Sequence, residues 1–301
     1  MTRNASWNGL GTDVKEAKSM NDVIELAGLN YTVEKVALQT INNQGIPGYM
    51  ATMAGDRFYG IVSDSYGIVQ NSEAFDFVDS MSSDLVYEKA GETASGMVYI
   101  IAKLPDVSIC GDSFTPHVIF RNGFNGKFSV AVAICPLRIV CQNQFSIAFK
   151  ESDNTVSIRH TINAKDRLEE AQHILKAVSD HMSHLNMLAE TMARKSVNVN
   201  QLDRIVRDLF PIKQGASARV AGMAEKNREA FMAEYNIADN ANFTGTAWGV
   251  INAYAGYITH TDPRGHKAER FENKFIKTTF DKPMNHILDV IERNTSLLLA
   301  A

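Results

Sequence analysis

The sequence has no long hydrophobic run and no obvious targeting segment. No stretch approaches the roughly 18 to 20 consecutive apolar residues that a membrane-spanning helix needs. The first residues, MTRNASWNGLGT, lack the apolar segment of a secretory signal peptide. Hydrophobic residues make up 45% of the chain and charged residues 21%, which is typical of a globular protein that folds in water. We therefore expect a cytoplasmic protein with no membrane partner.

Cysteine is scarce, and this excludes a disulfide framework. The three cysteines, Cys110, Cys135 and Cys141, form no CxxC pair, and their number is odd. Cys135 and Cys141 lie in or beside strand-like sequence, where a free cysteine usually packs as a small hydrophobic residue. A nucleophilic cysteine would need a local signature, and the sequence shows none.

The sequence also lacks the common motifs of catalysis, of metal binding and of phosphate binding. No GxSxG, HExxH or paired-acid motif is present, and the stretches NGLGT and NGFNG do not follow the strand–turn–helix order of a phosphate-binding loop. His173, His181 and His184 fall near one helical stripe, but no carboxylate or cysteine at ligand spacing accompanies them. We therefore expect no cofactor and no metal site, and the sequence favours a binding protein over an enzyme.

The net charge of −4 conceals an uneven distribution along the chain. Residues 1–102 carry 6 basic and 13 acidic side chains, a balance of −7. Residues 103–160 carry 6 basic against 4 acidic, and residues 194–228 carry 8 against 3. The acidic first third would repel a polyanion, whereas the two later segments would attract one. Any nucleic-acid site must therefore be local.

The hydrophobic periodicity changes near Thr161 and indicates an α+β fold. Before this point, alternating apolar segments predict strands in the ranges 31–40, 57–69, 96–104, 117–123, 127–141 and 155–161. Short helices are expected at 19–30, capped by Ser19 and with a buried stripe that includes Leu26, and at 71–81. The turn RNGFNG (121–126), with two Asn-Gly pairs, predicts a hairpin within the sheet. A β-rich lobe (1–160) and a helical lobe (161–301) are expected to pack as one compact unit.

The second half predicts a long helix from about 164 to 194, followed by helices near 198–210, 217–235, 245–260 and 283–299. In the long helix, apolar residues recur at alternating spacings of three and four. The seam consists of Leu168, Ala171, Leu175, Val178, Met182, Leu185, Ala189 and Met192. Its small residues, Ala171 and Ala189, suit packing against a sheet, so we expect a structural element and not a dimeric coiled coil.

The segment ICPLRIVCQNQFSIAF (134–149) is an apolar strand interrupted by polar residues. Each of these polar groups needs a hydrogen-bond partner or contact with water. Either the core holds a polar network here, or one face of the strand meets an external ligand. Because Pro136 is typical of an edge or bulged strand, we expect Arg138 to be exposed. For Asn143 we expect a buried amide.

Basic and amide side chains of the middle strands form the predicted nucleic-acid surface, because Arg and Lys contact phosphates while Asn bonds bases or sugars. Two arginines of a later helix, three residues apart on one face, extend it. The candidates are Arg121, Lys127, Arg138, Asn143, Arg159, His160, Arg204 and Arg207. The nearby Phe120, Phe124, Phe128 and Phe145 are candidate stacking surfaces for bases. The alternative is that these aromatics are core and the charges a solvated face.

Several segments resemble a known family in their order along the chain. These are SWNGLGT, AGLNYTVEKVAL, FYGIVSDSYGIVQNSEAFDFVD, YEKAGE, PLRIVCQNQFSIAF, SIRHT and GTAWGVINAYAGYITH. They resemble a phage/plasmid-like family catalogued as a domain of unknown function, from about Trp7 to Phe275. This chain has Asn8 and RNGFNG where the family usually has a histidine and a Ser-His-Asp-Gly turn. The order of strands, hairpin and long helix is also similar to that of single-strand annealing proteins of the Red-beta and RecT type.

This resemblance implies a mobile-element protein, since family members occur on phages and plasmids among genes for recombination and anti-restriction. The hypothesis that follows is a homo-oligomeric protein in the host cytoplasm that binds single-stranded DNA and promotes annealing. The alternative is a phage-encoded inhibitor that binds a host defence protein, which the acidic first third would suit.

Overall fold

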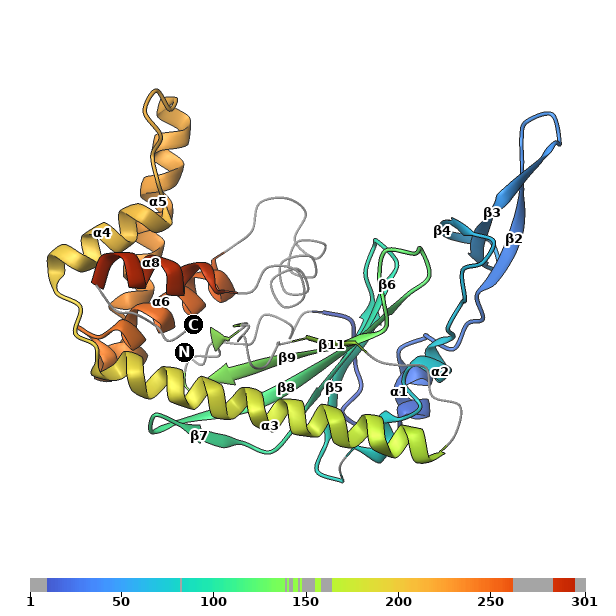
Figure 1. The fold of residues 1–301 in the computed structure, drawn as a ribbon, viewed down its shortest axis with the longest axis horizontal. Coiled ribbons are helices and arrows are strands. Elements are labelled where there is room, and N and C mark those ends of the chain that lie inside the picture. The colour runs from blue at the N-terminus through green and yellow to red at the C-terminus, as the bar shows by residue number, and fades with distance from the viewer. Residues whose placement is uncertain are drawn as a thin grey trace.

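A computed structural model describes residues 10–81, 83–138, 140, 143–145, 147, 155–157, 164–261 and 284–295. Strands fill its first half and helices its second, so the predicted α+β class is confirmed (Figure 1). The strands are β1 Thr12–Asp13, β2 Glu34–Gln39, β3 Gly45–Ala54, β4 Arg57–Ser63, β5 Val86–Glu92, β6 Met97–Lys103, β7 Val107–Ile109, β8 Asp112–Gly123, β9 Ala131–Arg138, β10 Asn143–Gln144 and β11 Thr155–Ser157. The helices are α1 Met20–Leu26, α2 Asn71–Ala74, α3 Ala164–Arg194, α4 Val199–Leu209, α5 Ala218–Tyr235, α6 Ala247–His260 and α8 His286–Thr295, with 3-10 turns η1 Val78–Ser80 and η2 Ala238–Phe243.

The main sheet is antiparallel and has the order β1-β5-β6-β8-β9-β10, while β7 pairs with β8 and β11 with β9. Alternate residues of its central strands belong to two separate apolar clusters, because side chains along a strand point to opposite faces. On β6, Val98 and Ile100 face one cluster, and Tyr99 and Ile101 face the other. All four side chains are fully buried, so the sheet is covered on both faces.

The long helix α3 crosses one face of the main sheet (yellow-green in Figure 1). The predicted seam is its buried side: Ala171, Leu185, Ala189 and Met192 have no more than a trace of exposed surface, and Val178 and Met182 are also buried. Leu175 is only half-buried, and Ile174 takes its place in the core. The seam therefore packs into the protein's own core, against the sheet and helix α6, as a structural element does.

Helices α4, α5, α6 and α8 gather at one end of the main sheet (Figure 1). Their ranges agree with the predicted helices to within a few residues. Helix α6 is buried along most of its length and lies beside β10 and α3. None of the described helices combines the length and the hydrophobicity that spanning a bilayer requires.

Strands β2, β3 and β4 form a separate three-stranded sheet, which we call the wing. It stands at the opposite end of the molecule from the helices (blue in Figure 1). Glu92 of β5 holds its base: the carboxylate accepts two hydrogen bonds from Arg57, at 2.8 and 2.6 Å, and one from the Tyr31 hydroxyl at 2.8 Å. Thr52 adds a hydrogen bond to the Phe124 carbonyl at 2.7 Å. The wing is thus fixed to the tip of the main sheet.

Three local expectations differ from the structure. Ser19 and Asp22 form the expected capping box of α1, but Leu26 is half-exposed and Met20 and Ile24 are buried instead. The predicted helix 71–81 is only the short α2 and the 3-10 turn η1. The predicted hairpin is present, but β8 and β9 end their pairing at Arg121 and Ala131, so its connection is a long loop and not an Asn-Gly turn.

We predict that Leu185→Ala lowers the free energy of unfolding by about 2 to 5 kcal/mol, because it leaves a cavity between α3 and the sheet. Met187→Ala, on the exposed side of the same helix, should change stability by less than about 0.5 kcal/mol. Urea denaturation of both variants measures the difference. If Leu185→Ala lost self-association but kept its stability, α3 would be an oligomer interface and the packing described above would be wrong.

Candidate nucleic-acid interface

The hairpin loop, counted from the end of the β8–β9 pairing and so including the last two residues of β8 (residues 122–130), is fixed by its own amide side chains. The buried Asn122 donates to the Val69 carbonyl and to Asn71 Oδ1, both at 3.0 Å, and accepts a hydrogen bond from the Gly123 amide. Asn125 accepts from the Lys127 amide at 2.9 Å and donates to the Ser95 carbonyl at 3.0 Å. The two asparagines of NGFNG therefore anchor the loop to its neighbours and do not form tight turns.

Each of the two glycines of this loop stands at a position where the geometry requires glycine. A Cβ on Gly123 would lie 2.8 Å from the Cβ of Phe128, so only glycine lets the Phe128 ring fold back over β8. Gly126 has φ +73°, in the left-handed region that glycine adopts without strain. Together with the anchoring amides, these glycines give the loop one defined shape. A ligand that binds here meets a preorganised surface.

A pocket of about 440 Å³ opens between this loop and the segment that follows β4. This hairpin-tip pocket is lined by Tyr66, Gly67, Val69, Asn122, Gly123, Gly126, Lys127, Phe128, Ser129 and Val130. Its volume lies within the usual range for small-ligand sites. Lys127 is exposed at its rim, and Phe128 is partly exposed. The pocket therefore combines a cation with an aromatic ring.

Arg121 and Tyr66 complete the surroundings of the pocket. The Arg121 guanidinium donates to the backbone carbonyl of Ser129 at 3.3 Å and lies 3.4 Å from its hydroxyl, so Arg121 is half-buried beside the loop. The Tyr66 hydroxyl donates to the Gly123 carbonyl at 3.2 Å. Burial raises the pKa of Tyr66, so the phenol keeps its proton and its donor role at neutral pH. Of the predicted binding residues, Lys127 thus lines the pocket, and Arg121 lies beside the loop that forms it.

The expectation that Arg138 is exposed is wrong. Its side chain has only 2% exposed surface, and its guanidinium donates to Asp112 Oδ2 at 2.8 Å and to the Asp239 carbonyl at 2.9 Å. The guanidinium also lies 5.5 Å from the ring centre of Phe243. Its acidic partner, Asp112, comes from the neighbouring strand β8. Arg138 therefore connects the sheet to η2 in the helical half and does not present its charge to a ligand.

Pro136 does not mark an edge strand. It pairs with Pro116 across β8 and β9. Both carbonyls bond outward, Pro116 O accepting from the Leu104 amide at 2.9 Å and Pro136 O from the Phe145 amide at 2.8 Å. Since the two residues form a non-hydrogen-bonded pair, neither needs to donate an N–H across it. Proline is therefore tolerated here inside the sheet, and Pro136 does not indicate that Arg138 is exposed.

Asn143 is buried, as predicted, and belongs to the same contact between sheet and helices. Its amide donates to the Asn252 carbonyl of α6 at 3.1 Å, and its Oδ1 lies 2.9 Å from His260 Nε2. A Cβ on Gly256 would lie 2.4 Å from the Glu234 carboxylate of α5 and 3.2 Å from this amide, so glycine lets α6 come close to both α5 and β10. Arg138 and Asn143 are therefore both buried and hydrogen-bonded to groups of the helical half.

The other predicted residues do not form one surface with the hairpin tip. The backbone positions of Arg121 and Arg138 are at opposite ends of β9, about 24 Å apart at a rise of about 3.4 Å per residue. Phe120, Phe124 and Phe145 are fully buried core residues, so their predicted stacking role is wrong; Phe128 alone of the four is partly exposed. Arg159 and His160 lie outside the described residues.

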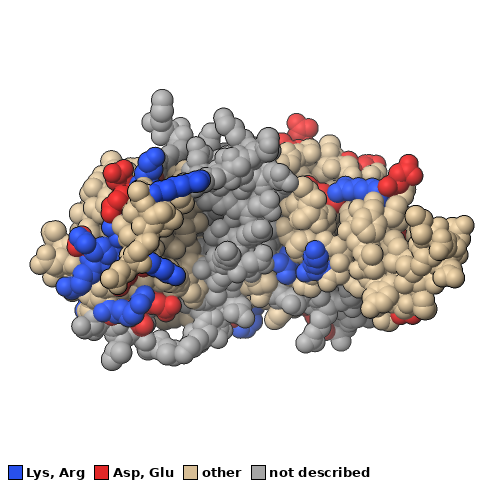
Figure 2. Space-filling model, turned by 90° about the horizontal axis from the view of Figure 1, so that it is seen from above, with Lys and Arg blue, Asp and Glu red and all other residues tan. Residues whose placement is uncertain are grey.

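A second basic surface lies at the helical end. Lys and Arg gather there (left in Figure 2). The exposed basic residues are Arg204 and Arg207 of α4, Arg219 and Lys226 of α5, and Lys213 of the segment between the two helices. Arg204 and Arg207 are exposed, and Arg207 Nε donates to Asp203 at 2.9 Å. Arg228 instead donates to the Phe210 carbonyl at the end of α4, which is a structural role. This surface is separated from the hairpin tip by the length of the main sheet (Figure 1).

The remaining candidate groups show no site chemistry. Cys135 is fully buried, as expected of a packing residue, and burial raises the pKa of the Cys110 thiol; Cys141 lies outside the described residues. His173 is exposed, His181 is buried and His184 is intermediate. Within the described ranges, no three His, Cys, Asp or Glu side chains are grouped as metal ligands would be.

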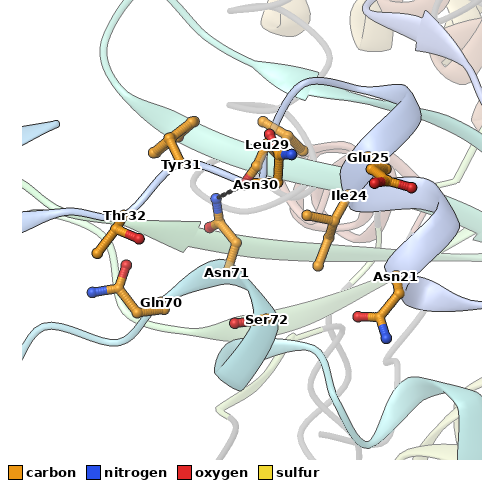
Figure 3. A pocket seen from close by; sticks show the side chains of 10 residues that line it. All are labelled: Asn21, Ile24, Glu25, Leu29, Asn30, Tyr31, Thr32, Gln70, Asn71 and Ser72. Atoms are coloured by element: carbon orange, nitrogen blue, oxygen red, sulfur yellow. Dashed lines mark hydrogen bonds between the residues drawn. The ribbon is translucent and has the colours of Figure 1, made fainter. Parts of the chain in front are cut away.

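A second pocket, of about 340 Å³, lies between α1 and α2 (Figure 3). Two of its amides already have partners: Asn71 donates to the Leu29 carbonyl at 3.0 Å, and Gln70 exchanges two hydrogen bonds with the Val33 backbone. Glu25 is the one ionisable carboxylate of its lining, which contains no Lys or Arg. An anionic ligand would not be attracted to this second pocket, so the hairpin-tip pocket is the better candidate.

The sequence analysis did not identify Tyr66 as part of the hairpin-tip pocket, although Tyr66 lies in a Ser/Gly-rich turn.

A family model described as a domain of unknown function (DUF932) matches residues 58–284. The chain belongs to this family. The match includes β4, the whole hairpin-tip pocket and α6, whereas β2 and β3 lie outside it. Neither the curated proteins nor the solved structures gave a match to the chain. Family membership thus fixes no activity, and function must be argued from the site.

We predict that Arg138→Ala lowers stability by about 3 kcal/mol or more, because it leaves the Asp112 carboxylate and the Asp239 carbonyl without their partner. Arg207→Ala removes a similar Arg–Asp pair from an exposed helix face and should cost less than about 1 kcal/mol. Thermal melts of the two variants give the comparison. Equal, small losses would show that the guanidinium of Arg138 is solvated in solution.

Proposed function

We propose that this protein binds single-stranded DNA and promotes strand annealing. The observation that carries the proposal is the hairpin-tip pocket, in which Lys127 and the partly exposed Phe128 meet in one ordered loop beside Arg121. Cations that contact phosphates and rings that stack on bases are the two elements of sequence-independent single-strand recognition. The resemblance to a phage/plasmid-like family adds that the protein acts in recombination or replication of a mobile element.

In this proposal each side chain has a defined task. Lys127 and Arg121 contact phosphates on either side of one nucleotide, while the base enters the pocket and stacks on Phe128. Tyr66 stays protonated and holds the loop through the Gly123 carbonyl. No bond is broken, so no cofactor is needed: the protein holds bases unstacked until a complementary strand pairs with them. A homo-oligomer would present successive pockets to one strand.

The basic surface on α4 and α5 supplies a second place for phosphates. Its arginines and lysines lie on exposed positions, so they would contribute long-range attraction more than a defined contact. We assign Arg204 and Arg207 this weaker role. Arg138 and Asn143 no longer belong to the proposed interface, because their side chains bind other parts of the chain.

We predict that the purified protein shifts a single-stranded oligonucleotide of about 60 nucleotides at about 50 mM salt, and that affinity falls steeply as salt rises. The double variant Arg121→Ala/Lys127→Ala should bind more weakly to every sequence and lower the salt slope by about 1.4, at about 0.7 per lost phosphate contact on a single strand. Salt titrations of binding measure both effects.

Lys176→Ala, on an exposed position of α3 beside Asp180, is the matched control and should leave the slope unchanged. Failure of the wild-type protein to bind, or binding that is indifferent to salt, contradicts the proposal. A pull-down after nuclease treatment covers the alternative of a host defence inhibitor. Recovery of one stoichiometric host protein without DNA would favour that function.

A further inference from the structure

The wing exposes a row of large apolar side chains that nothing in the described chain covers. Thr52, Gly60 and Val62 point toward the hairpin loop: Thr52 bonds the Phe124 carbonyl, Gly60 lies against Asn125, and Val62 lies near Gly126. Residues on the other face of the same strands point outward. Val36, Tyr49, Phe58 and Ile61 all lie there, and each has between 47% and 57% of its surface exposed.

The strand register makes this outer face continuous. Val36, Ala51 and Ile61 are opposite one another across β2, β3 and β4, and Met53 pairs with Phe58 in the neighbouring row. Tyr49 lies on the other side of the Ala51 row, two residues along β3, and therefore on the same face. At the far tip of β2 and β3, Ile41 is 99% exposed and Ile46 is 39% exposed. A contiguous apolar patch of this kind marks an interaction surface in most proteins.

The size and charge of the patch indicate what covers it. The four side chains of the outer face, each about half exposed, present on the order of 400 Å² of apolar surface, since a large apolar side chain has about 150 to 250 Å². A standard protein interface buries about 800 Å² per partner, of which somewhat more than half is apolar. The wing from Glu34 to Ser63 carries two acids and two bases, Glu34, Asp56, Lys35 and Arg57, and is neutral. Its own copy therefore matches it in size and meets no net repulsion.

The edge of the wing provides a further reason. Strand β2 is the outer strand of this sheet, and all its side chains are exposed or intermediate. An edge strand presents unpaired backbone N–H and C=O groups to another chain. The end of the molecule that the wing forms also shows mostly uncharged residues (right in Figure 2). A polyanion would gain little there, whereas a second strand edge with an apolar face would pair with it.

We infer that the wing is the surface through which two copies of this chain associate. The inference rests on the self-association included in the proposed function, and it names the surface responsible. The bidentate Arg57–Glu92 contact and the Thr52–Phe124 hydrogen bond hold the wing in one orientation on each copy. Self-association through the wing would therefore set a fixed relation between the hairpin-tip pockets of the two copies.

Sedimentation velocity of the full chain from about 1 to 100 μM, without DNA, tests this directly. We expect association that rises with concentration and persists in 1 M NaCl, because apolar contacts are not screened by salt. Ile61→Glu should weaken it at least about tenfold, as loss of a central contact does. Met187→Glu places the same charge on an equally exposed apolar position of α3 and should leave association unchanged.

Ile61→Thr controls for misfolding as the cause of weaker association, because it keeps a β-branched side chain on β4 while removing apolar surface. It should keep the melting temperature and still weaken association. A protein that is monomeric throughout the concentration range overturns the inference. So does association that survives Ile61→Glu, or that Met187→Glu weakens equally. DNA binding by the same samples is scored separately, so a monomer that binds DNA would reject the wing interface and keep the proposed function.

Discussion

A buried arginine, Arg138, which is paired with Asp112 of the neighbouring strand β8, connects the two halves of this protein. The guanidinium sits at the end of β9, and its hydrogen bond to the Asp239 carbonyl links the sheet to the 3-10 turn before α6. Burying an arginine costs free energy unless every donor finds an acceptor. Asn143 extends the contact to α6 itself. The two halves also share one apolar core, and these polar groups add contacts of defined geometry to it.

The two ends of the main sheet therefore use their polar side chains differently. At the helical end, polar side chains are buried and used for structure. At the other end, the loop between β8 and β9 and the base of the wing also use polar side chains for anchoring, but they leave Lys127 and part of Phe128 open to solvent. The basic character of residues 103–160 is thus shared between a core arginine and an exposed tip. Charge counted along the sequence cannot separate these two roles.

The fold class, the long helix and its buried seam could be predicted, because hydrophobic periodicity reports burial directly. The site was only half predictable. Arg121 and Lys127 flank a recognisable hairpin. Arg138, which the sequence pattern also predicts to be exposed, is instead buried. Its partners are distant in sequence, Asp112 by one hairpin and Asp239 by about a hundred residues. Pro136 misled because its facing partner, Pro116, makes a pair that needs no N–H. The sequence predicts the strands of the wing but not its exposed apolar face, because a local pattern does not show which face of a strand another element covers.

Photocrosslinking to single-stranded DNA tests the central claim, that bases enter the hairpin-tip pocket. An oligonucleotide that carries 5-iodouracil crosslinks to aromatic side chains in van der Waals contact with the base. After irradiation and tryptic digestion, the modified peptide should contain Phe128 or Tyr66, the two aromatic residues of the pocket lining. Crosslinks confined to peptides of α4 and α5, or to the tyrosine of the wing's outer face, Tyr49, would contradict this account.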